Sequence, residues 1–193
     1  AMPCAAAAVV LFFVPWATLK VNEKLNGQEA VLTAGPARLC EISTHNGETR
    51  EVILPDSSKV LLNAGSVIIF PERFSAAERT VFLSGEAIFK VTHNQNIPFT
   101  ANTSDLAIRV HGTTFNVNAS APDGNVATTL VNGKVEIGNG LSTTIIAPGQ
   151  QAITTLGDTR IEVKKVDTNV VTAWVRDMFY FDEKPLGEIM QEL

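Results

Sequence analysis

Apolar and polar residues alternate with a period of two along most of the chain from Arg38 onward. The clearest alternating runs are LAIRV at 106–110, KVEI at 134–137 and RIEVK at 160–164. Because successive side chains of a strand point to opposite faces of a sheet, such runs are typical of half-buried strands. The first run predicts that Leu106, Ile108 and Val110 face a core, and that Arg109 faces solvent.

Two further runs are denser in apolar residues. They are VIIF at 67–70 and VFLSGEAIFKV at 81–91. A strand that reads as a nearly continuous apolar run is typical of a position covered on both faces. These two segments are therefore predicted to be strands that are covered on both sides or that feed a central core.

Turn signals separate the strand-like runs. Asn-Gly occurs at 26–27, 46–47, 132–133 and 139–140, and Asp-Gly occurs at 123–124. Both residues of these pairs tolerate positive φ, which the two-residue turns of β-hairpins require. ATTLVNGKVEIG at 127–138 is the clearest example and predicts a hairpin. Short strands with frequent turns predict a mostly β domain of antiparallel stacked hairpins, similar to a β-sandwich.

The N-terminal segment differs in composition, because residues 4–19 are apolar and carry no charge. A helix that crosses a membrane needs about 20 apolar residues, and this run is slightly shorter and contains Pro15. The favoured interpretation is the remnant of a transmembrane helix within residues 1–20. A signal-peptide core and a buried element of the domain are the alternatives.

The C-terminal segment predicts a short helix. Asp182 can cap it, with Pro185 near its start. Residues at spacings of three, four and seven give it one apolar face, formed by Leu186, Ile189, Met190 and Leu193. This face must pack against something. We expect it to begin a second, small domain at 167–193 that is truncated in this chain, although packing on the β domain is the alternative.

Composition and motifs argue against several kinds of chemistry. The net charge is −5, and the lysines and arginines form no basic stripe, so nucleic acid is not an expected partner. His45, His93 and His111 lack metal-ligand spacing, and Cys4 and Cys40 are too few for a disulfide framework. No nucleophile elbow and no phosphate-binding glycine loop occur. We therefore expect a protein that is not an enzyme and that has no cofactor or metal.

Two alternative classes of function make structural demands that can be checked. An enzyme would need a cleft in which several of His93, His111, Asp105 and Glu86 converge. A carbohydrate-binding β-sandwich would need an exposed aromatic platform, for which Trp174 and Tyr180 are the candidates.

Five motifs in one order carry a family resemblance. They are VILPDSSKVLLNAGSVIIFPERF, RTVFLSGEAIFKVTHNQNIPF, VHGTTFNVNA, VATTLVNGKVEI and IAPGQQA. Together they resemble the periplasmic region of FecR-type anti-sigma regulators, over about residues 38–152. The segment from Trp174 to the end resembles the start of the small C-terminal β-α domain of that family. The chain departs from the family pattern at Ser57, where glycine is usual, and at Lys90, where an acidic residue is common.

The resemblance implies a single-pass protein of the bacterial inner membrane, with residues 1–20 in the membrane and an all-β periplasmic domain at 21–166. It implies a cytoplasmic domain, absent from this sequence, that binds an extracytoplasmic-function sigma factor. It also implies that the periplasmic region receives a signal from the N-terminal signalling domain of a TonB-dependent outer-membrane transducer. The protein would act by contact, and its membrane attachment would be through the N-terminal segment.

Two sets of residues are singled out within this frame. The first is structural, with Gly112 predicted to provide a bulge or a close backbone approach, and it comprises Gly85, Gly112, Phe115, Asn116 and Gly149. Asn116, if buried, needs hydrogen-bond partners, for which backbone groups are the expected source. The second is a predicted partner-binding surface near the C-terminus, formed by Phe179, Phe181, Leu186, Ile189 and Met190.

Overall fold

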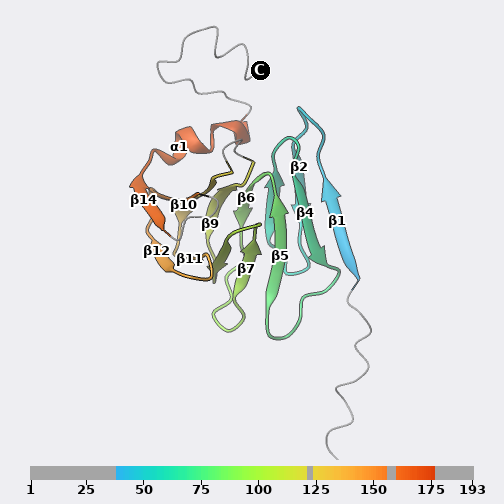
Figure 1. Cartoon of the computed structure of the whole chain (residues 1–193). Helices are drawn as coiled ribbons and strands as arrows, with labels where there is room; N and C mark the ends of the chain where they lie inside the picture. Colours follow the sequence, from blue (N-terminus) through green and yellow to red (C-terminus); the bar gives the residue numbers. More distant parts are fainter. Residues whose placement is uncertain (1–37, 121–123, 156–159, 177–193) are drawn as a thin grey trace, which may run out of the picture. The chain divides into compact units, whose positions relative to one another are not determined.

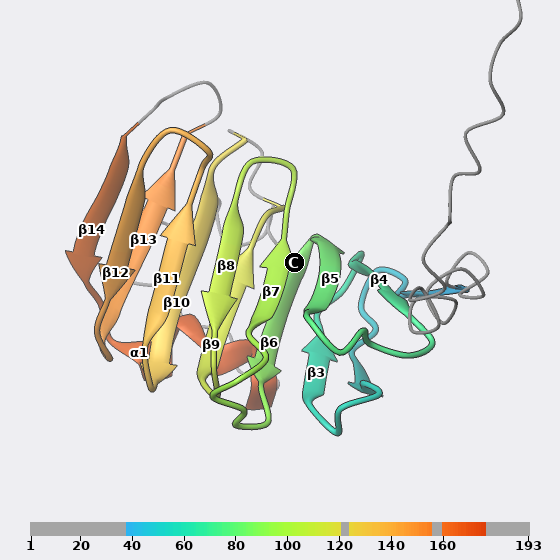
Figure 2. The same ribbon diagram turned by 90° about the horizontal axis from the view of Figure 1, so that it is seen from below.

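The structure is a computed structural model, and it describes residues 38–120, 124–155 and 160–176. Within these residues the strands form two seven-stranded sheets (Figures 1 and 2). The first sheet has the spatial order β1 (Leu39–Ser43), β4 (Val67–Pro71), β5 (Arg79–Ser84), β7 (Phe99–Asn102), β8 (Ala107–Val110), β11 (Val135–Gly138), β12 (Thr143–Ile146). The second has the order β2 (Arg50–Ile53), β3 (Lys59–Leu62), β6 (Glu86–Lys90), β9 (Thr114–Asn118), β10 (Val126–Asn132), β13 (Gln150–Thr154), β14 (Ile161–Lys165).

Both sheets follow the order of the chain from one edge to the other. The chain places one or two strands in one sheet and then crosses to the other, so the sandwich grows from β1 and β2 toward β12 and β14 (Figure 2). Neighbouring described strands are antiparallel, apart from β5 and β7, which pair in parallel. The predicted fold class, a mostly β and largely antiparallel sandwich-like domain, is confirmed.

The core lies between the two sheets and consists of the inward-facing residues of both. Leu106, Ile108 and Val110 are buried and Arg109 is exposed, as their alternation predicts. Phe115 is fully buried, and its ring stacks on Phe89 with the centroids 5.0 Å apart. Complete burial of one such ring contributes about 1.5–3 kcal/mol to the free energy of unfolding.

The prediction of a hairpin at 127–138 is wrong. β10 pairs with β9 and β13, whereas β11 pairs with β8 and β12, so the Asn132-Gly133 turn carries the chain from one sheet to the other. The Asn46-Gly47 turn also joins strands of different sheets, β1 and β2. By contrast, Asn139-Gly140 does close a hairpin, between β11 and β12. An alternating run on each side of Asn-Gly shows where the chain turns, but it does not show with which strand each run pairs.

Of the two alternatives predicted for the denser apolar runs, the one in which they feed a central core is confirmed and coverage on both faces is wrong. The residues of these runs that belong to the core are Ile68, Phe70, Val81, Leu83, Ala87, Phe89 and Val91. The residues of β4 alternate between buried and half-buried, and Phe82 on β5 is 53% exposed. The run at 81–91 contains two strands in different sheets, β5 and β6, with Gly85 between them. The apolar density arises because two half-buried strands meet without a polar loop.

Glycine marks the crossings between the sheets. A glycine with positive φ lies at each crossing between described strands except the one from β6 to β7, and these residues are Gly47, Gly65, Gly85, Gly112, Gly133 and Gly149. Such backbone conformations are costly for residues with a Cβ atom. The crossings therefore depend on glycine wherever the change of direction is this sharp.

A short helix that the sequence reasoning missed follows β14. α1 (Thr168–Val171) is capped by Asp167, whose side chain accepts a hydrogen bond from the Asn169 backbone N–H, and a 3₁₀ helix at Ala173–Arg176 continues it. α1 packs against β10. Among the described residues there is no helix whose length and apolar character would suffice to span a membrane. The predicted transmembrane segment at 1–20 and the predicted helix near the C-terminus lie outside the described residues.

Candidate functional site

A buried ion pair connects the two sheets. Asp56 lies in the turn between β2 and β3, and Arg79 is the first residue of β5 in the other sheet. Arg79 Nη1 lies 2.7 Å from Asp56 Oδ2, and the two side chains are only 5% and 14% exposed. The pair therefore joins the sheets at a place from which water is largely excluded.

The remaining polar atoms of this pair are also satisfied. Arg79 donates from Nε and Nη2 to the Ile97 carbonyl and from Nη1 to the Thr92 carbonyl, at 2.9–3.1 Å. Asp56 accepts hydrogen bonds from the backbone N–H and the hydroxyl of Ser58. A buried charge pair with complete hydrogen bonding is a structural feature, and it leaves no free group for chemistry. The sequence reasoning missed Arg79. The alternation in RTVFL could have identified it, because Arg79 stands two residues before Val81 and therefore on the same inward face.

A second polar network lies on β6 and β9. Asn116 is 1% exposed, and its Nδ2 donates to Glu86 Oε1 at 2.9 Å, while Asn63 Nδ2 donates to Glu86 Oε2 at 2.9 Å. Asn116 is buried, and its partner is a carboxylate, whereas the sequence reasoning expected backbone groups. Because Glu86 is half-buried and accepts hydrogen bonds from two side-chain amides, we assign this carboxylate a structural role.

The close backbone approach predicted at Gly112 is found, and a second one occurs at Gly85. A Cβ atom on Gly112 would lie 2.6 Å from the His93 Cα, and one on Gly85 would lie 2.7 Å from the Ser66 Cα. Gly149 also has a positive φ of 80°, but there is open space around it. Gly85 and Gly112 therefore permit two segments of backbone to touch, and Gly149 serves the turn alone.

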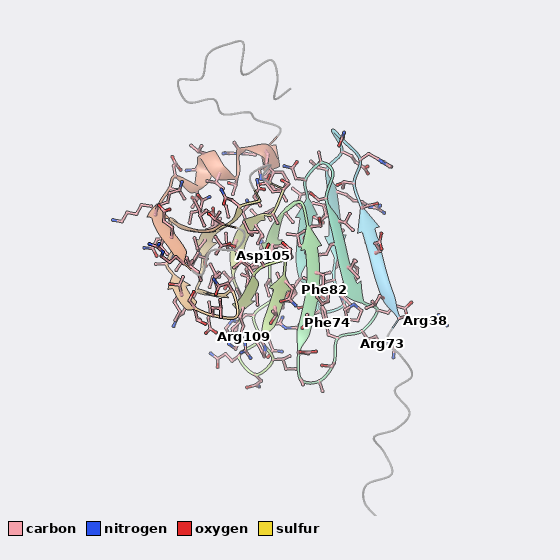
Figure 3. The ribbon with its side chains drawn as sticks, in the orientation of Figure 1. Arg38, Arg73, Phe74, Phe82, Asp105 and Arg109 are labelled. Atoms are coloured by element: carbon pink, nitrogen blue, oxygen red, sulfur yellow. The ribbon has the colours of Figure 1, made fainter. Side chains whose placement is uncertain are left out.

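Two of the three histidines, His93 and His111, line one groove. A cavity of about 510 Å³ lies at the crossing from β8 to β9, and it is lined by His93, Arg109, Val110, His111, Gly112, Thr113, Gly133, Lys134 and Glu136. The carboxylates named with these histidines for an enzyme lie elsewhere. Asp105 precedes β8, whereas Arg109 lies near the other end of that strand (Figure 3). Glu86 belongs to the network with Asn116.

The groove does not have the composition of a metal centre. In the described part of the chain, no three side chains of the histidine, cysteine, aspartate and glutamate types come close enough to hold a metal ion. The constellation that an enzyme would need is not assembled, because only two of its four residues line the groove. The groove brings together cationic side chains, which suit binding better than proton transfer.

Large apolar side chains are exposed on the sheets, in the turn between β11 and β12 and in the 3₁₀ helix. In the described residues they are Leu39, Ile53, Phe82, Leu141, Ile145, Val163 and Val175. Phe82 faces outward from β5 beside Val67 and Ile69, at a shallow cavity of about 250 Å³ (Figure 3). Exposed apolar side chains at strand edges are available for contact with another protein.

The aromatic platform that carbohydrate binding would need is not supported by Trp174. This residue is half-buried, and its indole N–H is buried with no hydrogen-bond partner in the described structure. Tyr180 lies outside the described residues. The predicted partner-binding residues Phe179, Phe181, Leu186, Ile189 and Met190 also lie outside them, so they stay a prediction.

Comparisons with known proteins agree with one another. A family model described as FecR protein matches residues 41–136. Two crystal structures of a candidate anti-sigma factor from Parabacteroides distasonis, at 2.50 Å and 1.65 Å resolution, are each 35% identical to this chain. The alignment with the first structure covers 80% of this chain and 73% of the chain in that structure, with a TM-score of 0.73. The second covers 79% and 72%, with a TM-score of 0.72. The comparison with curated proteins found no match.

Proposed function

The chain belongs to the FecR family of anti-sigma regulators, and we propose on this premise that it is the periplasmic signal-relay region of such a regulator. It receives a signal from the N-terminal domain of a TonB-dependent outer-membrane transducer and controls an extracytoplasmic-function sigma factor. The observation that carries the proposal is the 35% identity to anti-sigma factor structures over 80% of the chain.

The architecture supports an action by contact. The buried charged groups Arg79 and Asp56 are paired with each other, whereas apolar side chains such as Phe82 are exposed and available for contact. The sandwich within the domain predicted at 21–166 is the body that carries the signal in this proposal. The segment at 167–193 forms the start of a small β-α domain and presents Phe179, Phe181, Leu186, Ile189 and Met190 to the transducer.

The topology in this proposal is that of a single-pass inner-membrane protein. Residues 1–20 belong to the transmembrane helix, and a cytoplasmic domain that lies outside these 193 residues binds the sigma factor. A fusion of alkaline phosphatase after Leu193 tests this, because the enzyme is active only in the periplasm. We expect an active fusion in cells, and an inactive one would contradict the topology.

Copurification with the signalling domain of a transducer from the same genome tests the relay. We expect the domain to coelute with the chain, and we expect the Phe179→Ser and Ile189→Asp variants to lose it. Ile53→Ser is the matched control, because Ile53 is 64% exposed on β2, at the edge of the second sheet farthest from β14. Absence of coelution with the unaltered chain, together with unchanged hydrogen exchange, would refute the relay.

A further inference from the structure

We propose that the groove beside Gly112 is a binding site for the oxyanion group, carboxylate or phosphate, of a small ligand. The proposal rests on the residues of the groove and does not depend on the transducer relay.

The floor of the groove is made by two glycine crossings that lie against each other. A Cβ atom on Gly133 would lie 3.1 Å from the Gly112 carbonyl oxygen and 2.9 Å from Thr113 Oγ1. A Cβ atom on Gly112 would lie 2.6 Å from His93 Nδ1. At both positions the space that a side chain would take is already filled, by His93 at Gly112 and by Gly112 and Thr113 at Gly133, so the two crossings and the segment at His93 are packed tightly together beside the groove.

The register of the first sheet places the charged side chains together. Arg109 on β8 is directly opposite Glu136 on β11, and continuing this antiparallel register by two residues places His111 opposite Lys134. All four residues line the groove. Directly opposite and diagonal neighbours of this kind lie within reach of long side chains. The arrangement is therefore a square of one arginine, one lysine, one histidine and one glutamate.

The cations of the square are not used elsewhere in the described structure. The ion pairs found among the described residues are Arg79 with Asp56 and Lys59 with Glu51, so neither Arg109 nor Lys134 forms one. The His111 ring is oriented by donating from Nδ1 to the Asn94 carbonyl at 3.2 Å. In a chain with a net charge of −5, a groove with Arg109 and Lys134 against the single carboxylate of Glu136 is locally positive.

This chemistry suits an oxyanion. The guanidinium of arginine presents a planar fork of donors that matches carboxylate and phosphate, and lysine adds a point charge. The volume of about 510 Å³ lies within the range of small-molecule sites. The walls contributed by His93, Val110 and Thr113 provide contacts for the remainder of a small molecule.

The three histidines provide a direct test with the whole chain kept in a neutral detergent. The imidazole Cε1–H signals are followed by NMR during titration with inorganic phosphate and, separately, with succinate. We expect the His93 and His111 signals to shift with saturation and the His45 signal to stay in place, because His45 lies in the turn after β1. The two titrations distinguish phosphate from carboxylate ligands.

Charge variants make the test specific. We expect Arg109→Gln and Lys134→Gln to weaken binding of the effective anion by roughly tenfold or more, because each removes a charged hydrogen-bond donor. We expect Glu136→Gln to tighten it, because a repelling carboxylate is removed. Arg50→Gln is the matched control, since it removes the same charge from β2 at the far edge of the other sheet, and it should change nothing.

Two results would overturn the proposal. One is the absence of saturable shifts at His93 and His111 with either anion at millimolar concentration. The other is an equal loss of affinity in Arg50→Gln and Arg109→Gln, which would mean attraction by overall charge. Either result would leave coelution with the transducer domain unaffected, so the two proposals fail separately.

Discussion

Arg79 and Asp56 join the two sheets through an ion pair of 2.7 Å that is almost entirely excluded from water. Arg79 begins a strand of the first sheet, and Asp56 lies in the turn between two strands of the second. The guanidinium also donates hydrogen bonds to the carbonyls of Thr92 and Ile97. The ion pair and these hydrogen bonds hold the turn between β2 and β3, and the segment between β6 and β7, against the start of β5.

Replacement of Arg79 by methionine should lower the free energy of unfolding by roughly 3–5 kcal/mol, because it leaves Asp56 buried without a counter-charge. Chemical denaturation followed by circular dichroism measures this. Lys59→Met is the control, since the Lys59–Glu51 pair is more than half exposed and should contribute about 1 kcal/mol or less. Similar losses in both variants would contradict the role of burial.

Replacement of Ser57 by glycine should stabilise the protein. Among the described residues, Ser57 is the one non-glycine residue with positive φ, at 66°, and it occupies the position where the family resemblance places glycine. The strain at such a residue is about 1–2 kcal/mol, and part of its relief is offset by the greater chain entropy of glycine. We expect a gain of roughly 0.5–1 kcal/mol in the free energy of unfolding, measured by urea denaturation. Ser57→Ala retains the strain and should show no gain.

Replacement of Gly112 by alanine should be strongly destabilising. The φ of 155° and the approach of 2.6 Å to the His93 Cα act together, so the two backbone segments must separate. We expect a loss of roughly 2–5 kcal/mol from backbone strain and overpacking. Gly140→Ala, with positive φ but open space around it, isolates the conformational part and should cost less. Equal melting temperatures for the two variants would show that the close approach is unimportant.

Replacement of Asn116 by aspartate should cost more than replacement by alanine. Alanine removes one hydrogen bond to Glu86, at about 1–3 kcal/mol, whereas aspartate places a second carboxylate against it. Adding Glu86→Gln to Asn116→Asp should restore part of the loss. A double-mutant cycle in urea measures the coupling, and strictly additive effects would contradict direct contact.

Replacement of Lys90 by glutamate should stabilise the second sheet slightly. Lys90 is directly opposite Lys59 on β3, so two like charges face each other across the strands. A favourable cross-strand pair contributes about 0.2–1 kcal/mol. The gain should disappear at high salt, because exposed charges are screened. A gain that persists in about 1 M salt would indicate a different cause.

The candidate site followed from the sequence only in part. Gly112 could be recognised as a position of close approach, because a glycine between two strand-like runs commonly marks a bulge or a place where two backbones touch. The square of Arg109, His111, Lys134 and Glu136 could not be recognised. Its residues lie on β8 and β11 or directly beside them, and the pairing of these two strands spans a long sequence separation and leaves no local pattern.

The sequence by itself determined that the chain forms strands, which faces of them are apolar and where the chain turns. These properties depend on neighbouring residues, so Leu106, Ile108 and Val110 could be assigned to the core from their alternation alone. Only the tertiary structure decided that the turn at Gly133 joins two sheets instead of closing a hairpin. Pairing depends on which distant strand offers a complementary edge and buried face, and a local pattern of Asn-Gly between alternating runs is the same in both cases.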